Sequence, residues 1–326
     1  MSVHFLRQII RCLGSAALVA GAFAAHAQSF PSKPIRLVVP SAPGGSLDIL
    51  GRALGRALEE QPGLNVVVDN RAGASGSIGV LNVIRSPADG YTILISVPDA
   101  VTIYPLVNEK VKYRWDRDLT PLVRLGASSS VYSINAKSPA NSVKEFVALS
   151  QKGSFNYATQ GPGSSGHLLM EAFKTATGAK MTHIPYKGIA PGMLAVITGE
   201  SDIISSSMAS ATPHLQGGNL KLLATTRPTR YPSYPNVPTM AESGYPELAL
   251  ETWFGVFAPA GLKPDVAERL IQVLSTAVSS AAFREQMLKY GIESKPATGA
   301  AFGKVVADDT AFWKSIIDRS NVKVEE

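Results

Sequence analysis

The turn after residues 35–39 contains residues that are suited to hold a small anion. Gly44 and Gly45 follow an apolar run of strand type, and apolar residues at helical spacing begin just after Ser46. The first N–H groups of a helix have no partner inside the helix, and glycine places no side chain before an approaching carboxylate or phosphate. The turn is therefore a candidate anion cradle. A capped helix start, with Ser46 or Asp48 at or near the cap, explains the same residues.

A second glycine-rich turn runs from Gly161 to Gly166, between a strand pattern at 155–158 and a helix pattern. Its sequence Gly-Pro-Gly-Ser-Ser-Gly also satisfies the dinucleotide motif G-x-G-x-x-G. That motif needs a carboxylate about 20 residues further on to hold the ribose. Residues 184–188 read Ile-Pro-Tyr-Lys-Gly, which lacks this acid. We therefore expect a second anion cradle and no cofactor.

A third glycine-rich turn, residues 70–79, follows another strand pattern, and Ser75 and Gly76 supply further N–H groups beside the first turn. Each turn alone is compatible with a purely architectural role. Together they lie at the carboxyl ends of strands, where open α/β sheets tend to bind ligands. Their convergence favours a site for a small anion.

Residues 1–27 have the pattern of a secretory signal. Two arginines precede a small apolar run at 13–25, and Ala25 to Ala27 fits an A-x-A cleavage site. The run is too short to span a bilayer. We predict cleavage after Ala27 and a periplasmic protein, with a retained signal anchor as the alternative. Cys12, the one cysteine, lies before this site, so the mature chain would have no thiol chemistry.

The charge does not indicate a polymeric partner. The whole chain has a formal net charge of +6, and its basic residues are dispersed. The densest group, between Lys110 and Arg117, is diluted by Glu109, Asp116 and Asp118, and a nucleic-acid site would need a basic stripe. We expect no nucleic-acid partner.

The sequence lacks the metal-ligand spacings and nucleophile motifs that an enzyme would need. Beyond the leader the histidines are His167, His183 and His214, and no two have the spacing of metal ligands. The serines at 128–130 and 205–207 lie outside any G-x-S-x-G motif, and His167 is expected to cap or pack a helix. We therefore predict no catalytic or metal site. A periplasmic hydrolase or lyase is the alternative function, and it would need Asp202 or His183 as its base.

Short apolar strands alternate with amphipathic helices, which predicts an α/β protein with mixed, mostly parallel sheets. Cleavage after Ala27 would leave roughly 300 residues, enough for two domains of roughly 100 to 150 residues each. Two similar segments, 131–139 and 253–261, each run from a strand through a proline loop into a helix. They suit two crossings between lobes. We therefore predict one lobe at 29–130 plus 254–326, another at 131–253, and a stiff hinge between them.

The predicted strands are 35–39, 65–69, 91–96, 131–135, 155–158, 182–184, 202–205, 220–225 and 253–257, and the predicted helices are 46–60, 76–85, 142–151, 166–176, 190–198, 264–280, 281–290 and 299–318.

Eight segments, in order along nearly the whole mature chain, resemble the Bug-type receptors of tripartite tricarboxylate transporters. They are Pro40-Ser-Ala-Pro-Gly-Gly-Ser-Leu-Asp48, Asp69-Asn-Arg-Ala-Gly-Ala-Ser-Gly76, Ala88-Asp-Gly-Tyr-Thr92, Tyr157-Ala-Thr-Gln-Gly-Pro-Gly-Ser-Ser-Gly-His-Leu168, His183-Ile-Pro-Tyr-Lys-Gly188, Gly199-Glu-Ser-Asp202, Pro235-Asn-Val-Pro-Thr239 and Trp253-Phe-Gly-Val-Phe-Ala-Pro-Ala-Gly261.

The resemblance implies a type II periplasmic-binding-protein fold that closes on a small carboxylate, such as an organic, amino or aromatic acid. Backbone N–H groups and water from two facing turns would hold the ligand, and the expected partners are transporter membrane subunits or a sensor kinase. We expect a monomer. Carried over by motif, the ligand-binding residues are Gly44, Gly45 and Ser46 on one lobe and Thr159, Gly161, Ser164 and Ser165 on the other.

Further cleft candidates are Tyr186, Lys187 and Gly188, which lie on another strand-to-helix turn, and Asp202, which follows the start of a predicted strand. Asp202 has two readings, a ligand contact or a structural bond to loop N–H groups. The chain departs from the family pattern at Asp99 and Tyr104. If Asp99 faces the cleft, it would repel a second carboxylate and favour an ammonium or hydroxyl group at the distal end of the ligand, and if it faces solvent it carries no information.

Overall fold

The structure is a computed structural model that describes residues 30–44, 46–320 and 322. The chain divides into a unit of residues 1–32 and a unit of residues 33–326, and every element below belongs to the second. The predicted secretory signal at 1–27 lies outside the described residues. Among the described residues, no helix combines the length and apolar character needed to cross a membrane.

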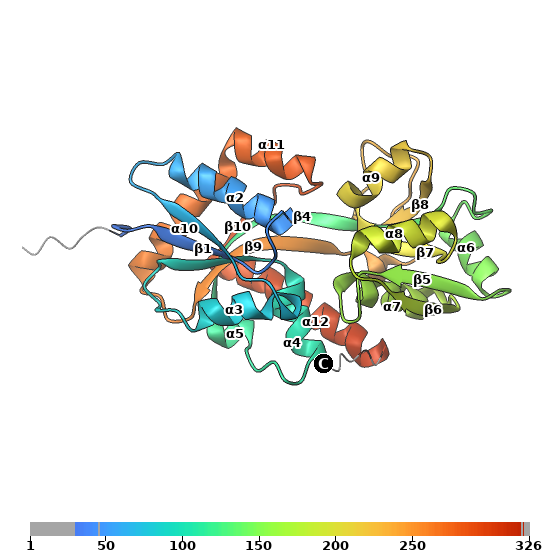
Figure 1. The fold of residues 1–326 in the computed structure, drawn as a ribbon, viewed down its shortest axis with the longest axis horizontal. Coiled ribbons are helices and arrows are strands. Elements are labelled where there is room, and N and C mark those ends of the chain that lie inside the picture. Colours follow the sequence, from blue (N-terminus) through green and yellow to red (C-terminus); the bar gives the residue numbers. More distant parts are fainter. Residues whose placement is uncertain (1–29, 45, 321, 323–326) are drawn as a thin grey trace, which may run out of the picture. The chain divides into compact units, whose positions relative to one another are not determined.

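The first group of strands surrounds β1, whose sequence Ile-Arg-Leu-Val-Val is buried except at Arg36. β1 pairs in parallel with β2 and β3, and the antiparallel strands β9 and β4 extend the sheet beyond β3 (Figure 1). The strands are β1 (Ile35–Val39), β2 (Val66–Asn70), β3 (Thr92–Ser96), β4 (Leu119–Asn135), β9 (Glu251–Pro259) and β10 (Ala297–Thr298). The associated helices are α2 (Ser46–Glu59), η1 (Ala74–Gly76), α3 (Ser77–Ile84), η2 (Asp99–Ile103), α4 (Tyr104–Val107), α5 (Trp115–Asp118), α10 (Pro264–Ser279), α11 (Ala281–Lys289) and α12 (Gly299–Ser320).

The second group of strands has the same plan around β5, which pairs in parallel with β6 and β7. The strands are β5 (Phe155–Thr159), β6 (Met181–Pro185), β7 (Ile203–Ser207) and β8 (Leu220–Thr225). The helices are α6 (Val143–Ser150), α7 (Ser165–Thr177), α8 (Ile189–Thr198), α9 (Met208–Gln216) and η3 (Pro246–Leu248). Repeated strand-turn-helix units therefore deliver several helix N-termini to the same edge of each sheet.

The strand β4 joins the two groups. Its first part, Leu119 to Ser129, pairs with β9, and its last part, Ser130 to Asn135, pairs with β7 and β8 (Figure 1). The antiparallel pairs all involve β4 or β9, while the outer pairs are parallel, so the sheet is mixed as predicted. The predicted parallel majority is wrong, because four of the described pairings are parallel and five are antiparallel. The lobe boundaries at 130/131 and 253/254 stay a prediction.

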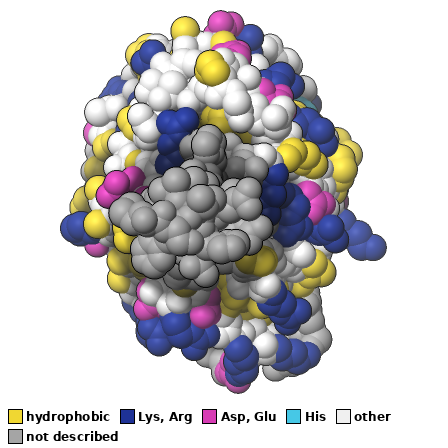
Figure 2. Space-filling model, turned by 90° about the vertical axis from the view of Figure 1, so that its left-hand side faces the viewer, with side chains coloured by type: hydrophobic (Ala, Val, Ile, Leu, Met, Phe, Trp, Pro, Cys, Tyr) yellow, Lys and Arg dark blue, Asp and Glu magenta, His cyan; other side chains and the backbone are white. Residues whose placement is uncertain are grey.

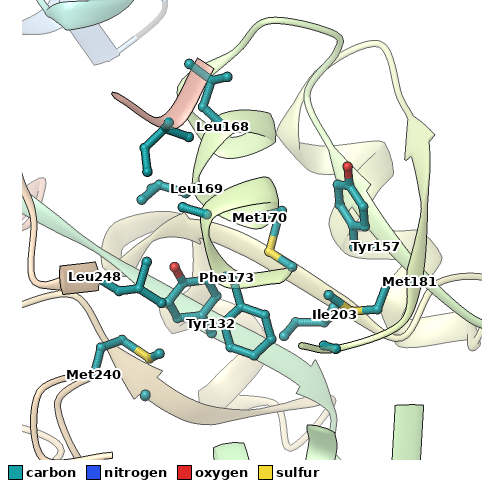
Figure 3. Packing of buried hydrophobic residues seen from close by; sticks show 14 of the residues in the cluster. Tyr132, Tyr157, Leu168, Leu169, Met170, Phe173, Met181, Ile203, Met240 and Leu248 are labelled. Carbon is teal, nitrogen blue, oxygen red and sulfur yellow. The ribbon is translucent and has the colours of Figure 1, made fainter. Parts of the chain in front are cut away.

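One large apolar cluster packs α7 and α12 against β4. Tyr132 of β4 and Phe173 of α7 have ring centroids 5.0 Å apart, and Met170, Met240 and Leu248 lie around them (Figure 3). Trp313, near the end of α12, belongs to the same cluster. Burial of these large side chains is the main stabilising contribution to this region.

Charged side chains do not form a basic stripe on the face shown in Figure 2. Lys and Arg there are interspersed with acidic, hydrophobic and other side chains. The exposed segment 114–118 is a local network in which Arg114 pairs with Asp116 and Arg117 with Asp118. Its charges are therefore largely neutralised by one another.

Candidate functional site

A cavity of about 690 Å³ opens between the two groups of strands and is the largest of the described cavities. This volume suits a small molecule. Its lining comes from four strand-to-helix turns and from β9, β4 and β7. The first two glycine-rich turns contribute Ser41, Gln160, Ser165 and Gly166 to this lining, and the third contributes none of its described residues.

The floor of the cavity is hydroxyl-rich. In the antiparallel pairs, Ser128 of β4 lies opposite Thr252 of β9, and Ser130 lies opposite Ser207 of β7. Because side chains two residues apart share a strand face, these pairs point the same way. The lining serines are Ser41, Ser128, Ser130, Ser165, Ser205, Ser206, Ser207 and Ser210.

Among the described residues, the first turns or N-caps of four α-helices line this cavity. They are Leu47 of α2, Ser165 of α7, Gly188 before α8 and Ser207 before α9. A helix N-terminus carries about half a positive charge and unpaired N–H donors. The described lining includes no lysine or arginine, so these helix ends supply its positive potential.

Several polar atoms of the lining lack a partner. Within the described residues, Ser41 Oγ, Gln160 Oε1 and Ser205 Oγ are buried without a hydrogen bond. Ser205 is only 2 % exposed. Buried polar atoms normally have partners, because leaving one unpaired costs about 1–3 kcal/mol. Three such atoms around one cavity favour a polar ligand there.

The first predicted cradle is used in part by the chain itself. Gly44, with φ +84°, donates its N–H to Asp48 Oδ2 at 2.9 Å, and Arg52 and Asn70 also bond this carboxylate. Burial raises the pKa of Asp48, but these hydrogen bonds outweigh it and hold the pKa below its usual value. Gly45 and the side chain of Ser46 lie outside the described residues.

The third turn packs against the first. Gly76, with φ +91°, is buried, and a Cβ there would lie 2.8 Å from Ala100 Cβ and 3.2 Å from Pro40 O. Ser75 is exposed and has φ +50°, which is rare for a residue other than glycine. Neither residue lines the cavity, so the visible role of Gly76 is to let this turn approach the turn after β1.

Asp99 lines the cavity and bridges to the second group of strands. It begins the π-helical turn η2, and its Oδ1 accepts a hydrogen bond from the N–H of Ser165, the first residue of α7, at 3.2 Å. Burial raises the pKa of Asp99, and the bond from Ser165 opposes this effect. Of the two orientations considered for Asp99, the structure has the one that faces the cavity.

The second predicted cradle is built around Ser164, the N-cap of α7. Ser164 Oγ accepts from the N–H of His167 at 3.2 Å and donates to Gly161 O at 2.7 Å. Thr159 is fully buried, and its Oγ1 accepts from the N–H of Gly161. These three predicted site residues shape the turn, whereas Ser165 reaches the cavity itself.

Two histidines stack behind this turn. The rings of His167 and His183 lie 3.9 Å apart, and Tyr157 stacks on His183 at 5.0 Å. His167 Nδ1 accepts from the N–H of Gly163 at 3.0 Å, which confirms its predicted capping or packing role. Burial, followed by the neighbouring His183, lowers the pKa of His167 to about 4, so this ring is neutral near pH 7.

The remaining predicted site residues lie away from the described lining. Tyr186 Oη is 3.4 Å from Ser201 Oγ, and Lys187 is exposed. Asp202 Oδ2 accepts from the N–H of Asn156 at 2.7 Å, which supports the structural reading of Asp202. Burial raises the pKa of Asp202 against this bond. Neither Asp202 nor His183, the two candidate bases, lines the cavity.

The serine runs were the residues that sequence reasoning missed. Serines 128–130 and 205–207 lack a nucleophile motif, yet the register of β4 and β7 brings serines of both runs to the cavity. Two runs of three serines in strand-compatible positions are the signal that could have identified them. Among the described residues, no group of three or more His, Cys, Asp and Glu side chains is arranged to hold a metal.

Comparisons with known proteins place the chain in a family. A family model described as "Tripartite tricarboxylate transporter family receptor" matches residues 50–322. The protein BugT of Bordetella pertussis is 34% identical over 302 residues, which cover 92% of this chain and 93% of BugT.

Solved structures agree in fold. A structure described as a periplasmic transporter is 31% identical to this chain, with a TM-score of 0.79. The match covers 91% of this chain and 100% of the other chain. A protein of R. palustris solved with adipate is 29% identical, with a TM-score of 0.79, over 90% of this chain and 99% of its own. The two-lobe periplasmic-binding-protein fold predicted from the sequence is thereby confirmed. The chain belongs to the tripartite tricarboxylate transporter family of solute-binding receptors, and it is a receptor and not an enzyme.

Proposed function

We propose that this receptor captures a small carboxylate in the cavity between its two groups of strands. The observation that carries the proposal is the convergence of four helix N-termini on a cavity whose described lining holds no lysine or arginine. Helix ends and serine hydroxyls stabilise an anion without a cationic side chain. The R. palustris relative solved with adipate supports the same ligand class.

In this proposal Ser165 and Asp99 face the solute directly. Gly44, Gly161 and Ser164 shape the turns that carry the lining residues, and the hydroxyl-rich floor completes the contacts. The hydrolase alternative lacks support, because its two candidate bases lie outside the described lining.

The proposed setting is the periplasm, after removal of residues 1–27. The receptor would act there as a monomer and deliver its solute to transporter membrane subunits, or report it to a sensor kinase. Intact mass of the protein purified from the periplasm tests the processing step, and the expected N-terminal residue is Gln28. A mass that retains the leader would overturn it.

Thermal-shift measurements on the processed protein test ligand capture. The panel holds mono-, di- and tricarboxylates, amino acids and aromatic acids. A ligand at one hundred times its dissociation constant adds about 2.7 kcal/mol of stability. A rise in Tm for one class supports the proposal. No rise with any acid, together with no acid released on denaturation and seen by mass spectrometry, would overturn it.

A further inference from the structure

Asp99 occupies the N-terminus of α7 and thereby limits which end of a solute can bind there. Its carboxylate already occupies the N–H of Ser165, so the chain supplies its own anionic group to the N-terminus of α7. Asp48 likewise takes the N–H of Gly44 before α2, and Ser207 accepts from the N–H of Ser210 in α9, whereas α8 begins after Gly188 without a side-chain cap. One ligand carboxylate can therefore bind at a helix N-terminus away from Asp99.

The surroundings of Asp99 do not offset a second negative charge. Asp99 is the charged residue among the described lining residues, so no lysine or arginine of that lining offsets its carboxylate. Ser165 donates to Asp99, and Gln160 Oε1, which lies beside Gly166 in the same turn, is a buried acceptor without a partner among the described residues. This end of the cavity therefore presents acceptors and calls for a donor.

We propose that the receptor selects a monocarboxylate whose distal end carries an ammonium or hydroxyl group, and that Asp99 discriminates against dicarboxylates. The inference rests on the proposed function above and narrows its substrate class. An ammonium group would pair with Asp99 and donate to Gln160. A dicarboxylate would place a second negative charge beside the carboxylate of Asp99, which weakens binding, whereas an ammonium group offsets the burial that disfavours the ionised form of Asp99.

The matched probes are adipate, 6-aminohexanoate and 6-hydroxyhexanoate, which have the same carbon chain and differ at one end. Calorimetric titrations at pH 7 compare the processed wild-type protein with Asp99→Asn, which keeps the shape of the side chain and an oxygen for Ser165. In the wild type, the two monocarboxylates are expected to bind at least about tenfold more tightly than adipate. In Asp99→Asn, this preference is expected to fall by at least about tenfold, mainly through tighter adipate binding.

Asp265→Asn is the matched control, because it makes the same charge change at an exposed position in the first turn of α10 that does not line the cavity. It should keep the wild-type preference. Thermal unfolding of each variant establishes that it is folded.

The outcomes separate this inference from the proposed function. Wild-type binding of adipate as tight as that of 6-aminohexanoate would overturn the role of Asp99 and leave the carboxylate receptor intact. An equal gain for all three acids in Asp99→Asn would show that Asp99 merely competes with ligands for α7, which also overturns the inference. If no acid in the full carboxylate panel binds the wild type or Asp99→Asn, the proposed function fails, and the inference fails with it.

Discussion

Ser130 on β4 lies directly opposite Ser207 on β7, at the point where β4 passes from its pairing with β9 to its pairing with β7. This register aligns two serine runs that are more than seventy residues apart in the chain. Their hydroxyls line the cavity together with the N-terminus of α9. The strand that joins the two groups of strands thus also lines the cavity.

Replacing Ser205 by Ala should weaken ligand binding without weakening the fold. Ser205 Oγ is buried, lines the cavity and has no partner among the described residues. We expect affinity for the best solute of the thermal-shift panel to fall about tenfold, which corresponds to one hydrogen bond of roughly 1.4 kcal/mol. The free energy of unfolding should stay the same or rise, because no bond of the unliganded protein is lost. Calorimetric titration and urea unfolding measure the two quantities.

Ser133→Ala is the matched control for this variant. Ser133 Oγ is equally buried and unpaired within the described part of the chain, but it does not line the cavity. Its replacement should change stability like Ser205→Ala and leave affinity unchanged. Equal loss of affinity in both variants would contradict the assignment of the cavity as the ligand site.

The carboxyl of Asp309 should make folding stability depend on pH. Burial raises the pKa of Asp309 to about 7 from an ordinary value of 3.8, although Thr102 and Trp313 donate to it. Between these two pH values the folded protein keeps a proton that the unfolded chain releases. The stability that the folded protein gains by keeping the proton on Asp309 is therefore fully present below pH 3.8. It is lost as pH rises towards 7, by at most about 1.4 kcal/mol per pH unit.

Asp309→Asn should remove this dependence, and denaturant unfolding at several pH values between 4 and 8 measures it. The neighbouring Asp308→Asn is the control, because Asp308 is exposed and pairs with Lys304. A wild-type profile parallel to that of Asp309→Asn would contradict the raised pKa.

Apolar periodicity alone predicted most elements closely. The expected helix at 264–280 is observed at Pro264–Ser279, and the expected strand at 220–225 at Leu220–Thr225. The first part of β4 was missed because Pro121, Gly126 and the serines resemble a loop, and only pairing with β9 makes this segment a strand. The helix α9 was missed because it is rich in small residues and contains Pro213.

The site was predicted in outline only. The sequence indicated glycine turns ahead of helices. The register of the strands cannot be read from the sequence, so the serine-lined floor of the cavity could not be predicted. It also could not reveal that Asp48 takes the N–H of Gly44, or that Asp99 reaches Ser165 across 66 positions. These contacts depend on how the strands are ordered in space, which local spacing does not encode.

Two glycines should respond to alanine with opposite signs. A Cβ on Gly255 of β9 would lie 2.1 Å from the ring of Phe302, which is fully buried, so Gly255→Ala should destabilise the protein by about 1–3 kcal/mol. A Cβ on Gly303, inside α12, meets Pro121 at an ordinary 3.7 Å. Gly303→Ala should therefore stabilise the protein by roughly 0.5–1 kcal/mol, because alanine favours the helix. Urea unfolding measures both changes, and equal signs would contradict the packing of Phe302 on β9.

The histidine stack should contribute a pH dependence opposite to that of Asp309. Burial and the neighbouring His183 lower the pKa of His167 to about 4, from an ordinary value of 6.5. Between these values the unfolded chain binds a proton that the folded protein excludes, so stability rises with pH from 4 to 6.5 and then levels off. His167→Asn keeps an acceptor for the N–H of Gly163 and should flatten this rise, while the loss of the stacked ring lowers stability at every pH. NMR titration gives the direct check: the ring signals of His167 should not shift between pH 8 and about 5, and a midpoint near 6.5 would contradict the buried, neutral ring.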